Sequence, residues 1–200
     1  MVFVYGVLVF MVSPLLFSWT PVPPELLQIQ YDVIKNGKVI GHMTSSKAEK
    51  DGIIQYTTES SVKVSMLITI NVYNKVQGSF YKGFLQDASL MRKVNGKSSA
   101  NTRITWNSNG YMVNENGSSH TLNSRISFST ACLMYVEPVD MQYIFSENFL
   151  SFIPVREVAP HKYELILPDG HNNFYTYENG RCVEVEVITS FATIYIRPKK

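Results

Sequence analysis

The stretch IQYTTESSVKVSMLITINVYNKV, residues 54–76, decides the fold of this chain. Its even positions stay apolar through the middle of the run, at Val62, Val64, Met66, Ile68, Ile70 and Val72. The odd positions between them are mostly polar. This period of two predicts a half-buried β-strand, because successive side chains of a strand point to opposite faces. A helix would place Ser65 and Thr69 on the same face as Val62, so the pattern excludes one.

Residues 54–76 are long for a single strand. At about 3.3 Å per residue a straight run would extend roughly 75 Å, whereas a typical strand has only about 5–6 residues. We therefore predict that the run bends, or contains a β-bulge, near Ser60, Ser61 or Asn74 and wraps around a core. A long curved strand of this kind is typical of a barrel or a rolled sheet.

The composition is that of a folded single-domain protein. Of the 200 residues, 12% are aromatic and 17% are charged, and no linker divides the chain. A chain of this length buries a substantial core. The net charge of +2 is small and dispersed, so it does not indicate a nucleic-acid-binding surface. We therefore expect no nucleic-acid partner.

The first 24 residues contain no charged side chain. Pro14 interrupts the apolar run that begins at Val2, and three further prolines end the segment. We expect residues 1–24 to be a signal peptide that is cleaved on export, and residues 25–200 to be one antiparallel β domain. The alternative is an uncleaved membrane anchor, because the run is just long enough to span a bilayer.

Turn signals recur through the rest of the chain. Seven of the eleven glycines follow Asn or Asp, as in Asn36-Gly37 and Asn95-Gly96. Such pairs accept the positive φ angles of tight hairpin turns. The predicted strands are residues 27–33, 39–44, 54–76, 78–85, 88–94, 98–106, 111–113, 163–167, 173–177, 183–187 and 191–196. The fold class is therefore all-β and mainly antiparallel, with a single curved sheet that forms a β-roll or an incomplete barrel.

The alternation is lost in residues 131–152, where Met, Tyr, Phe and Pro are mixed. We expect this segment to be irregular, with a short helix over residues 140–145, and to cap the open end of the roll. Irregular segments carry binding sites more often than strands do. The candidate ligand-binding residues are the aromatic and carboxylate side chains of this segment, namely Tyr135, Glu137, Tyr143 and Glu147.

Several motifs resemble those of one family. They are YDVIKNGK at residues 31–38, Phe145-Ser146-Glu147 in the irregular segment, and Leu167-Pro168-Asp169-Gly170 followed by Tyr175, Tyr177, Asn179 and Gly180. The family consists of exported bacterial proteins that are known only as a domain of unknown function. The resemblance covers nearly the whole chain after the leader. It implies a spiral β-roll, a source of the Bacteroidetes type and a location outside the cytoplasm, and it brings no catalytic residue.

Export would make Cys132 and Cys182 candidates for a disulfide, since such bonds persist outside the cytoplasm. Each cysteine also lies in an apolar segment, as is typical of a small buried residue. Both interpretations stay open, because two cysteines do not establish their own pairing.

Signals for catalysis and metal binding are weak. The four histidines form neither a His-x-His nor a His-x-x-x-His pair, so the sequence indicates no metal site and no cofactor. Ser146, His161 and Asp169 would have to gather from distant positions to form a triad, and no Gly-x-Ser-x-Gly motif supports one. The sharper enzymatic hypothesis is a hydrolase in which Glu137 and Glu147, about 5–10 Å apart, act as paired carboxylates.

Four functional hypotheses follow from these patterns. The favoured one is an exported envelope protein, not an enzyme, that binds an apolar or lipid-like ligand inside the curved sheet. The second is a structural or protein-interaction module whose edge strand pairs with another envelope protein. The third is the hydrolase with Glu137 and Glu147. The fourth is an integral outer-membrane barrel, which shares the alternating pattern.

Overall fold

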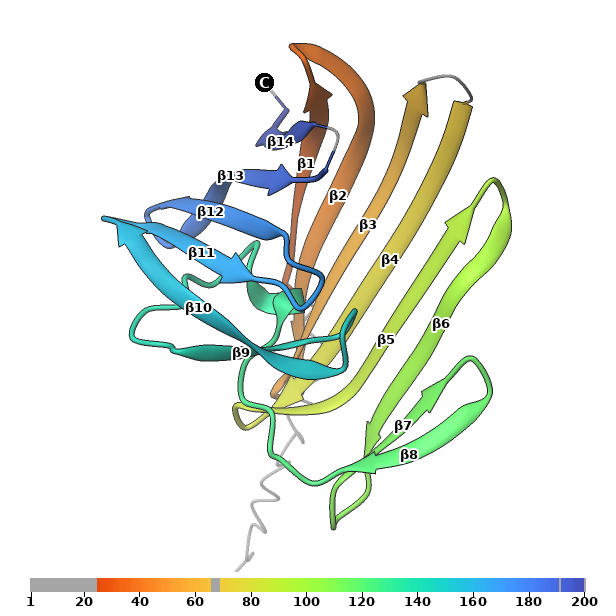
Figure 1. The fold of residues 1–200 in the computed structure, drawn as a ribbon. Helices are drawn as coiled ribbons and strands as arrows, with labels where there is room; N and C mark the ends of the chain where they lie inside the picture. The colour runs from red at the N-terminus through yellow and green to blue at the C-terminus, as the bar shows by residue number, and fades with distance from the viewer. Residues whose placement is uncertain (1–24, 66–68, 191, 200) are drawn as a thin grey trace, which may run out of the picture.

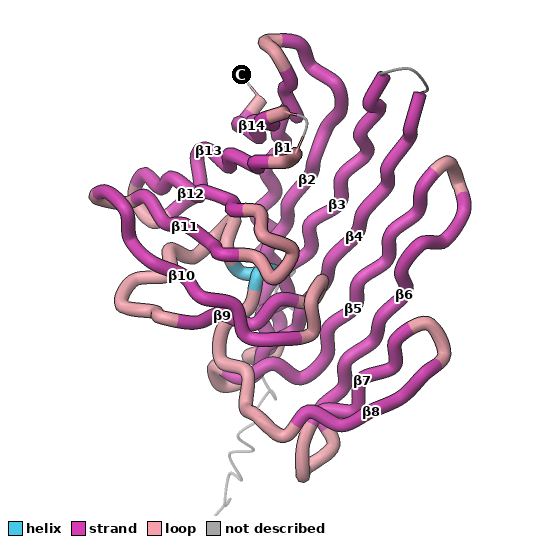
Figure 2. The backbone as a smooth tube through the Cα atoms, in the orientation of Figure 1, coloured by secondary structure: helices cyan, strands magenta, loops and turns pink. Residues whose placement is uncertain are grey.

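The computed structural model describes residues 25–65, 69–190 and 192–199, and strands make up most of them (Figures 1 and 2). The signal-peptide prediction for residues 1–24 lies outside the described residues. The strands are β1 (Glu25–Lys35), β2 (Lys38–Lys50), β3 (Ile53–Ser65), β4 (Thr69–Tyr81), β5 (Phe84–Val94), β6 (Lys97–Trp106), β7 (Tyr111–Glu115), β8 (Ser118–Leu122), β9 (Tyr143–Ser146), β10 (Ser151–Ala159), β11 (Lys162–Ile166), β12 (Asn172–Glu178), β13 (Arg181–Ile188) and β14 (Thr193–Pro198). A single 3₁₀ turn in the described chain, η1, spans Thr130–Cys132. Within these ranges no helix has the length and hydrophobicity needed to cross a bilayer.

All fourteen strands of the described chain belong to one sheet. The strand order is β8-β7-β6-β5-β4-β3-β2-β1-β14-β13-β12-β11-β10-β9, and each neighbouring pair is antiparallel. Because β8 and β9 stand at the two ends of this order, the sheet is curled but not closed. Strands β1 to β8 form a large half, and β9 to β14 form a smaller half that faces it (Figure 1). The prediction of one antiparallel β-roll is therefore confirmed.

Residues 54–76 form a hairpin, not the single long strand that their alternation predicts. Strand β3 ends at Ser65, β4 begins at Thr69, and these two residues pair. The pairing joins even positions to even positions, as in Val62↔Val72. The chain therefore reverses while its apolar side chains stay on one face. The residues between the two strands lie outside the described chain.

The bulge predicted at Ser60, Ser61 or Asn74 is wrong. The register between β3 and β4 is continuous over the whole hairpin. The hairpin removes the reason for the prediction, because neither strand has to extend over the full length of the run. The register shifts instead between Ser79 and Phe80, where β4 meets β5.

The strand predicted over residues 78–85 is also divided by a turn. Strand β4 ends at Tyr81 and β5 begins at Phe84. Lys82 and Gly83 between them have φ angles of 48° and 77°. Two successive residues with positive φ form the tight turn of a hairpin, which Lys-Gly signals less plainly than Asn-Gly.

The chain between β8 and β9, residues 123–142, contains no strand and is called the irregular segment below. It confirms the irregular segment predicted over residues 131–152 only as far as residue 142, and the helix predicted over residues 140–145 is wrong. Residues Tyr143–Ser146 form β9, which pairs with the start of β10. Asp140 has a φ of 58°, a left-handed conformation that interrupts a right-handed helix. The Tyr-Ile-Phe run that follows favours a strand.

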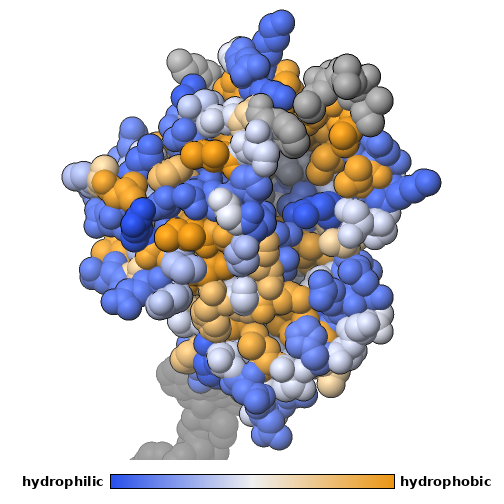
Figure 3. All heavy atoms as spheres, viewed as in Figure 1, coloured by the Kyte–Doolittle hydropathy of each residue, from blue (hydrophilic) through white to orange (hydrophobic). Residues whose placement is uncertain are grey.

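The core lies between the two halves of the roll. Its fully buried residues come from both halves and from the irregular segment, and include Tyr31, Val33, Leu85, Ile104, Tyr111, Leu133, Phe145, Leu165, Tyr177 and Val185. Hydrophobic residues also gather on the visible face where the halves meet (Figure 3). The outer face of the smaller half instead carries ion pairs such as Arg197–Glu184. Apolar side chains thus face the core and charged side chains face outward, as the alternation in the sequence predicts.

Candidate functional site

An apolar cavity of about 160 Å³ lies between the two halves of the roll. One wall comes from β2, β3 and β4, the opposite wall comes from β12, β13 and β14, and the irregular segment closes it. The lining residues are Met43, Thr58, Val76, Thr130, Ala131, Met134, Tyr175, Val185, Val187 and Ile196. None of them carries a charge. The volume is that of roughly five water molecules in the liquid, so it suits a small apolar group or one end of a longer chain.

Two threonines of this wall bear hydroxyl groups, and each has a partner that does not itself line the cavity. Thr58 Oγ1 lies 3.1 Å from Ser45 Oγ. Thr130 Oγ1 donates a hydrogen bond of 2.5 Å to Glu147 Oε2. The proton of the Thr130 hydroxyl is therefore directed to Glu147.

Tyr175 supplies the third polar group of the wall. Burial raises the pKa of Tyr175 above its ordinary value, so the hydroxyl keeps its proton. A protonated tyrosine hydroxyl can donate this proton to a hydrogen-bond acceptor.

Glu147 bonds Thr130 but does not itself line the cavity, and it is only 1% exposed. Ser129 Oγ donates to Oε1 and Thr130 Oγ1 donates to Oε2. Burial raises the pKa of Glu147, because the loss of hydration outweighs the hydrogen bonds that favour the carboxylate. None of the ion pairs of the described chain includes Glu147. The carboxyl group therefore fixes η1 to the turn that follows β9.

Tyrosine hydroxyls fix the rest of the irregular segment to the strands. The Tyr135 hydroxyl lies 2.6 Å from the carbonyl oxygen of Ser45 and 3.2 Å from that of Leu27. The Tyr177 hydroxyl donates to the carbonyl oxygen of Leu133 at 2.9 Å. Burial raises the pKa of both tyrosines. Tyr135, a ligand-binding candidate from the sequence, thus has its hydroxyl bound to main-chain oxygens.

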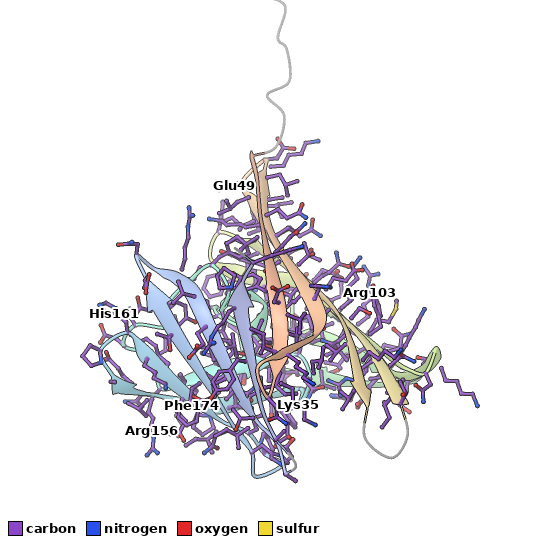
Figure 4. The ribbon with its side chains drawn as sticks, turned by 90° about the horizontal axis from the view of Figure 1, so that it is seen from above. Lys35, Glu49, Arg103, Arg156, His161 and Phe174 are labelled. Atoms are coloured by element: carbon purple, nitrogen blue, oxygen red, sulfur yellow. The ribbon has the colours of Figure 1, made fainter. Side chains whose placement is uncertain are left out.

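Glu137 and Tyr143, two other candidates from the sequence, lie away from the cavity. Glu137 Oε1 is 2.9 Å from His161 Nδ1, and His161 lies at the outer edge of the smaller half (Figure 4). Tyr143 is 61% exposed on β9. In the described chain no hydrogen bond or ion pair joins Glu137 to Glu147, so the two carboxylates of the hydrolase hypothesis have separate partners. None of the four candidates lines the cavity itself, and Glu147 bonds Thr130, which does.

The triad considered from the sequence is not assembled. Ser146 is buried, and His161 pairs with a glutamate. A different series occurs on the surface, where His171 Nδ1 lies 3.3 Å from Asp169 Oδ1 and His171 Nε2 lies 2.9 Å from Ser190 Oγ. These residues belong to the turns after β11 and β13, and none of them lines the cavity. The contacts of His171 with Asp169 and Ser190 therefore connect the turn after β11 to the turn after β13. Among the residues that the structure describes, no three potential metal ligands gather into a site.

A second cavity, of about 190 Å³, lies on the other side of η1. Its lining includes Phe128, Cys132 and Val136 from the irregular segment, and Tyr56 and Phe80 from β3 and β4. It also includes Gly52 from the turn between β2 and β3, and Lys82 and Gly83 from the turn between β4 and β5. The irregular segment thus lies between two cavities, and the second one reaches the hairpin turns at one end of the sheet.

An open cleft of about 720 Å³ lies where β2 and β3 separate. The pairing of these strands ends at Gly41↔Val62. Beyond this pair the cleft is lined in part by Lys35, Lys38 and Lys63, with Lys35 at the end of the β1–β2 hairpin (Figure 4). Lys38 and Lys63 are exposed, so solvent screens their charges. This cleft shares no lining residue with the two cavities.

Cys132 and Cys182 are both free and buried, so the disulfide considered from the sequence is not formed. Burial raises the pKa of each thiol to about 12. Because the thiolate is the reactive form, we expect iodoacetamide to modify neither cysteine of the folded protein at about pH 8. After unfolding without reductant both cysteines should react, and mass spectrometry counts the adducts. Modification that requires reductant would contradict the free thiols.

Comparison with known proteins shows a related fold. The crystal structure of a beta-barrel-like protein of the domain of unknown function DUF1849 from Brucella abortus is similar to this chain, with a TM-score of 0.60. The alignment covers 90% of this chain and 97% of the other at 9% sequence identity, so the likeness shows the fold alone. No curated protein matches the chain. A family model described as a domain of unknown function, DUF6134, matches residues 31–199. Since this match spans most of the chain, the protein belongs to the DUF6134 family.

Proposed function

We propose that this protein is an exported envelope protein that binds an apolar or lipid-like ligand between the two halves of its β-roll. The observation that carries the proposal is the uncharged cavity of about 160 Å³ inside a sheet that is not closed. Ligand pockets are typically lined by apolar side chains with a few polar groups, as this one is. The export part of the proposal is supported by the apolar, uncharged residues 1–24 of the sequence.

The inner face continues beyond the cavity with further apolar side chains. Val62 and Val72 share a face with Val76, and Ile194 shares a face with Ile196. Val62, Val72 and Ile194 are only half-buried. Each methylene group transferred from water to such a surface contributes about 0.8 kcal/mol. A chain longer than the cavity would therefore gain binding energy along this face.

The protein-interaction alternative has less support at one edge of the sheet. Strand β8, which spans Ser118–Leu122, has five residues, and most of its side chains are exposed and polar. Short polar edge strands discourage pairing with a further strand. The hydrolase alternative has less support, because Glu137 bonds His161 whereas Glu147 bonds Ser129 and Thr130, and neither carboxylate lines the cavity.

Filling the cavity is expected to abolish ligand binding. Val76 lines the cavity on β4, so Val76→Phe places an aromatic ring inside it. With methyl pentyl ether as probe, an NMR titration should shift amides around the cavity of the unmodified protein. The Val76→Phe variant should bind the ether at least about tenfold more weakly. Val187→Phe, on the opposite wall, is an independent filling variant.

The matched control is Val158→Phe, because Val158 is 43% exposed on β10. This variant should bind the ether as the unmodified protein does. Lipid extraction from the purified protein, followed by mass spectrometry, is expected to identify a recurrent bound lipid. Preparations that are always empty, together with a protein that does not bind the ether, would refute the proposal.

A further inference from the structure

We propose that the cavity selects an apolar ligand with an uncharged hydroxyl or amide group, which Thr130 and Tyr175 bind while Glu147 behind them disfavours an anion. This inference rests on the proposed function, because it specifies the polar end of the ligand. Thr130 and Tyr175 both line the cavity, and they approach it from η1 and from β12. The otherwise apolar lining of the cavity thus includes two residues with hydroxyl groups that approach it from different elements.

Thr130 offers a hydrogen-bond acceptor to a ligand in the cavity. A threonine hydroxyl has one proton and two lone pairs. The proton of Thr130 is directed to Glu147 Oε2, at an Oγ1 to Oε2 distance of 2.5 Å. Only lone pairs remain for a group inside the cavity. Thr130 therefore accepts a hydrogen bond from an O–H or N–H of the ligand.

Tyr175 offers a donor. It lines the cavity from β12, and its hydroxyl keeps its proton because burial raises its pKa. The hydroxyl can therefore donate to an oxygen of the ligand. A ligand hydroxyl both donates and accepts, and an amide does so through its N–H and C=O. Either group complements Thr130 and Tyr175 together, whereas an ether or an ester has no proton for Thr130.

The charges around the cavity disfavour an anionic ligand. None of the lining residues is a lysine, arginine or histidine, so an anionic group would lose its hydration without gaining a countercharge. Glu147 is fully buried next to Thr130, and the side chains that bond it, Ser129 and Thr130, are neutral. A carboxylate or phosphate in the cavity would therefore lie near a second acidic group. A neutral headgroup avoids both costs.

Three probes with short alkyl chains test this selection by NMR titration. Hexan-1-ol and methyl pentyl ether are isomers, but only the alcohol has a proton to donate. Hexanoate has the same chain with an anionic end. We expect the alcohol to bind about five- to tenfold more tightly than the ether, because it adds one hydrogen bond in a dry site. Hexanoate at neutral pH should bind more weakly than either.

Isosteric variants show which residues of the cavity interact with the polar group of each probe. Thr130→Val should reduce the preference for alcohol over ether by about fivefold and should still bind the ether, whereas Tyr175→Phe should weaken the binding of both probes by a similar factor, because both oxygens accept a hydrogen bond from Tyr175. Thr130→Ser retains the hydroxyl and should retain the preference. Glu147→Gln should raise the affinity for hexanoate. Thr121→Val and Tyr143→Phe are the controls, since both residues are exposed.

The outcomes separate this inference from the proposed function. Equal affinity of the unmodified protein for the alcohol and the ether would refute the inference and leave the apolar site intact. A preference that survives in Thr130→Val would refute the role of Thr130, and unchanged affinities for both probes in Tyr175→Phe would refute the role of Tyr175. If none of the three probes bound, the proposed function itself would be refuted.

Discussion

Replacing Glu147 with alanine is expected to lower the free energy of unfolding by about 3–5 kcal/mol. The substitution removes the acceptor of two hydroxyl groups, those of Ser129 and Thr130, and leaves a space in the interior. Each buried donor that loses its partner costs about 1–3 kcal/mol, so two such losses and a cavity account for the total. Urea unfolding followed by far-UV circular dichroism measures the change. Glu115→Ala is the control, because Glu115 is exposed on β7 and its loss should cost less than about 0.5 kcal/mol.

The Glu147→Gln variant separates the charge of this group from its hydrogen bonds. Burial raises the pKa of Glu147 in the folded protein above its ordinary value of 4.5, which we assign to the unfolded chain. The folded state therefore binds the proton more tightly. The resulting stability is fully present below the unfolded pKa and is lost as the pH rises through the folded pKa. A glutamine mimics the protonated acid at every pH.

Wild-type protein should therefore lose stability relative to Glu147→Gln as the pH rises from about 4 to about 7. Urea unfolding of both proteins across this range gives the difference directly. A difference that does not change with pH would mean that Glu147 titrates alike in the folded and unfolded states. A difference that changes in the opposite direction would mean that the hydrogen bonds from Ser129 and Thr130 outweigh the loss of hydration.

The sequence predicts most strands of the fold because its turns are marked locally. Asn36 and Gly37, for example, have φ angles of 50° and 72°, as an Asn-Gly hairpin turn requires. The change of direction between β3 and β4 is missed because the sequence of residues 65–69 contains neither Gly, Asn nor Pro. The period of two also continues in the sequence from β3 into β4, and even positions pair with even positions. The alternation indicates on which face of the sheet each side chain lies, but it does not indicate where the chain reverses direction.

The candidate site is predicted less well than the fold. The sequence singles out Glu147 as a carboxylate in an aromatic segment, and the structure buries it. Its partners Ser129 and Thr130 and the distant Tyr175 carry no periodic or motif signal. They meet only because the smaller half of the sheet folds over the larger one. Such contacts depend on the curvature of the whole sheet, which no local pattern encodes.

Replacing Gly41 with alanine is expected to destabilise the protein by about 3 kcal/mol or more. A Cβ atom at this position would lie 2.3 Å from the carbonyl oxygen of Ser61 and 2.7 Å from the Cα of Val62. Both are backbone atoms of β3, so neither can move aside as the end of a flexible side chain can. Gly41↔Val62 is also the last pair of the β2–β3 ladder. The added methyl group must therefore force the two strands apart where the cleft begins.

Gly37→Ala is the matched control for this substitution. Gly37 has a φ of 72°, and no atom lies within 4 Å of a Cβ built there, so the control measures only the backbone cost of about 1 kcal/mol. Hydrogen exchange at the amides of β2 and β3 reports the separation of the strands. Equal costs for the two variants would show that β2 and β3 accommodate the methyl group. Met43, two residues after Gly41, lines the apolar cavity, so strands forced apart by Gly41→Ala should also weaken the binding of methyl pentyl ether.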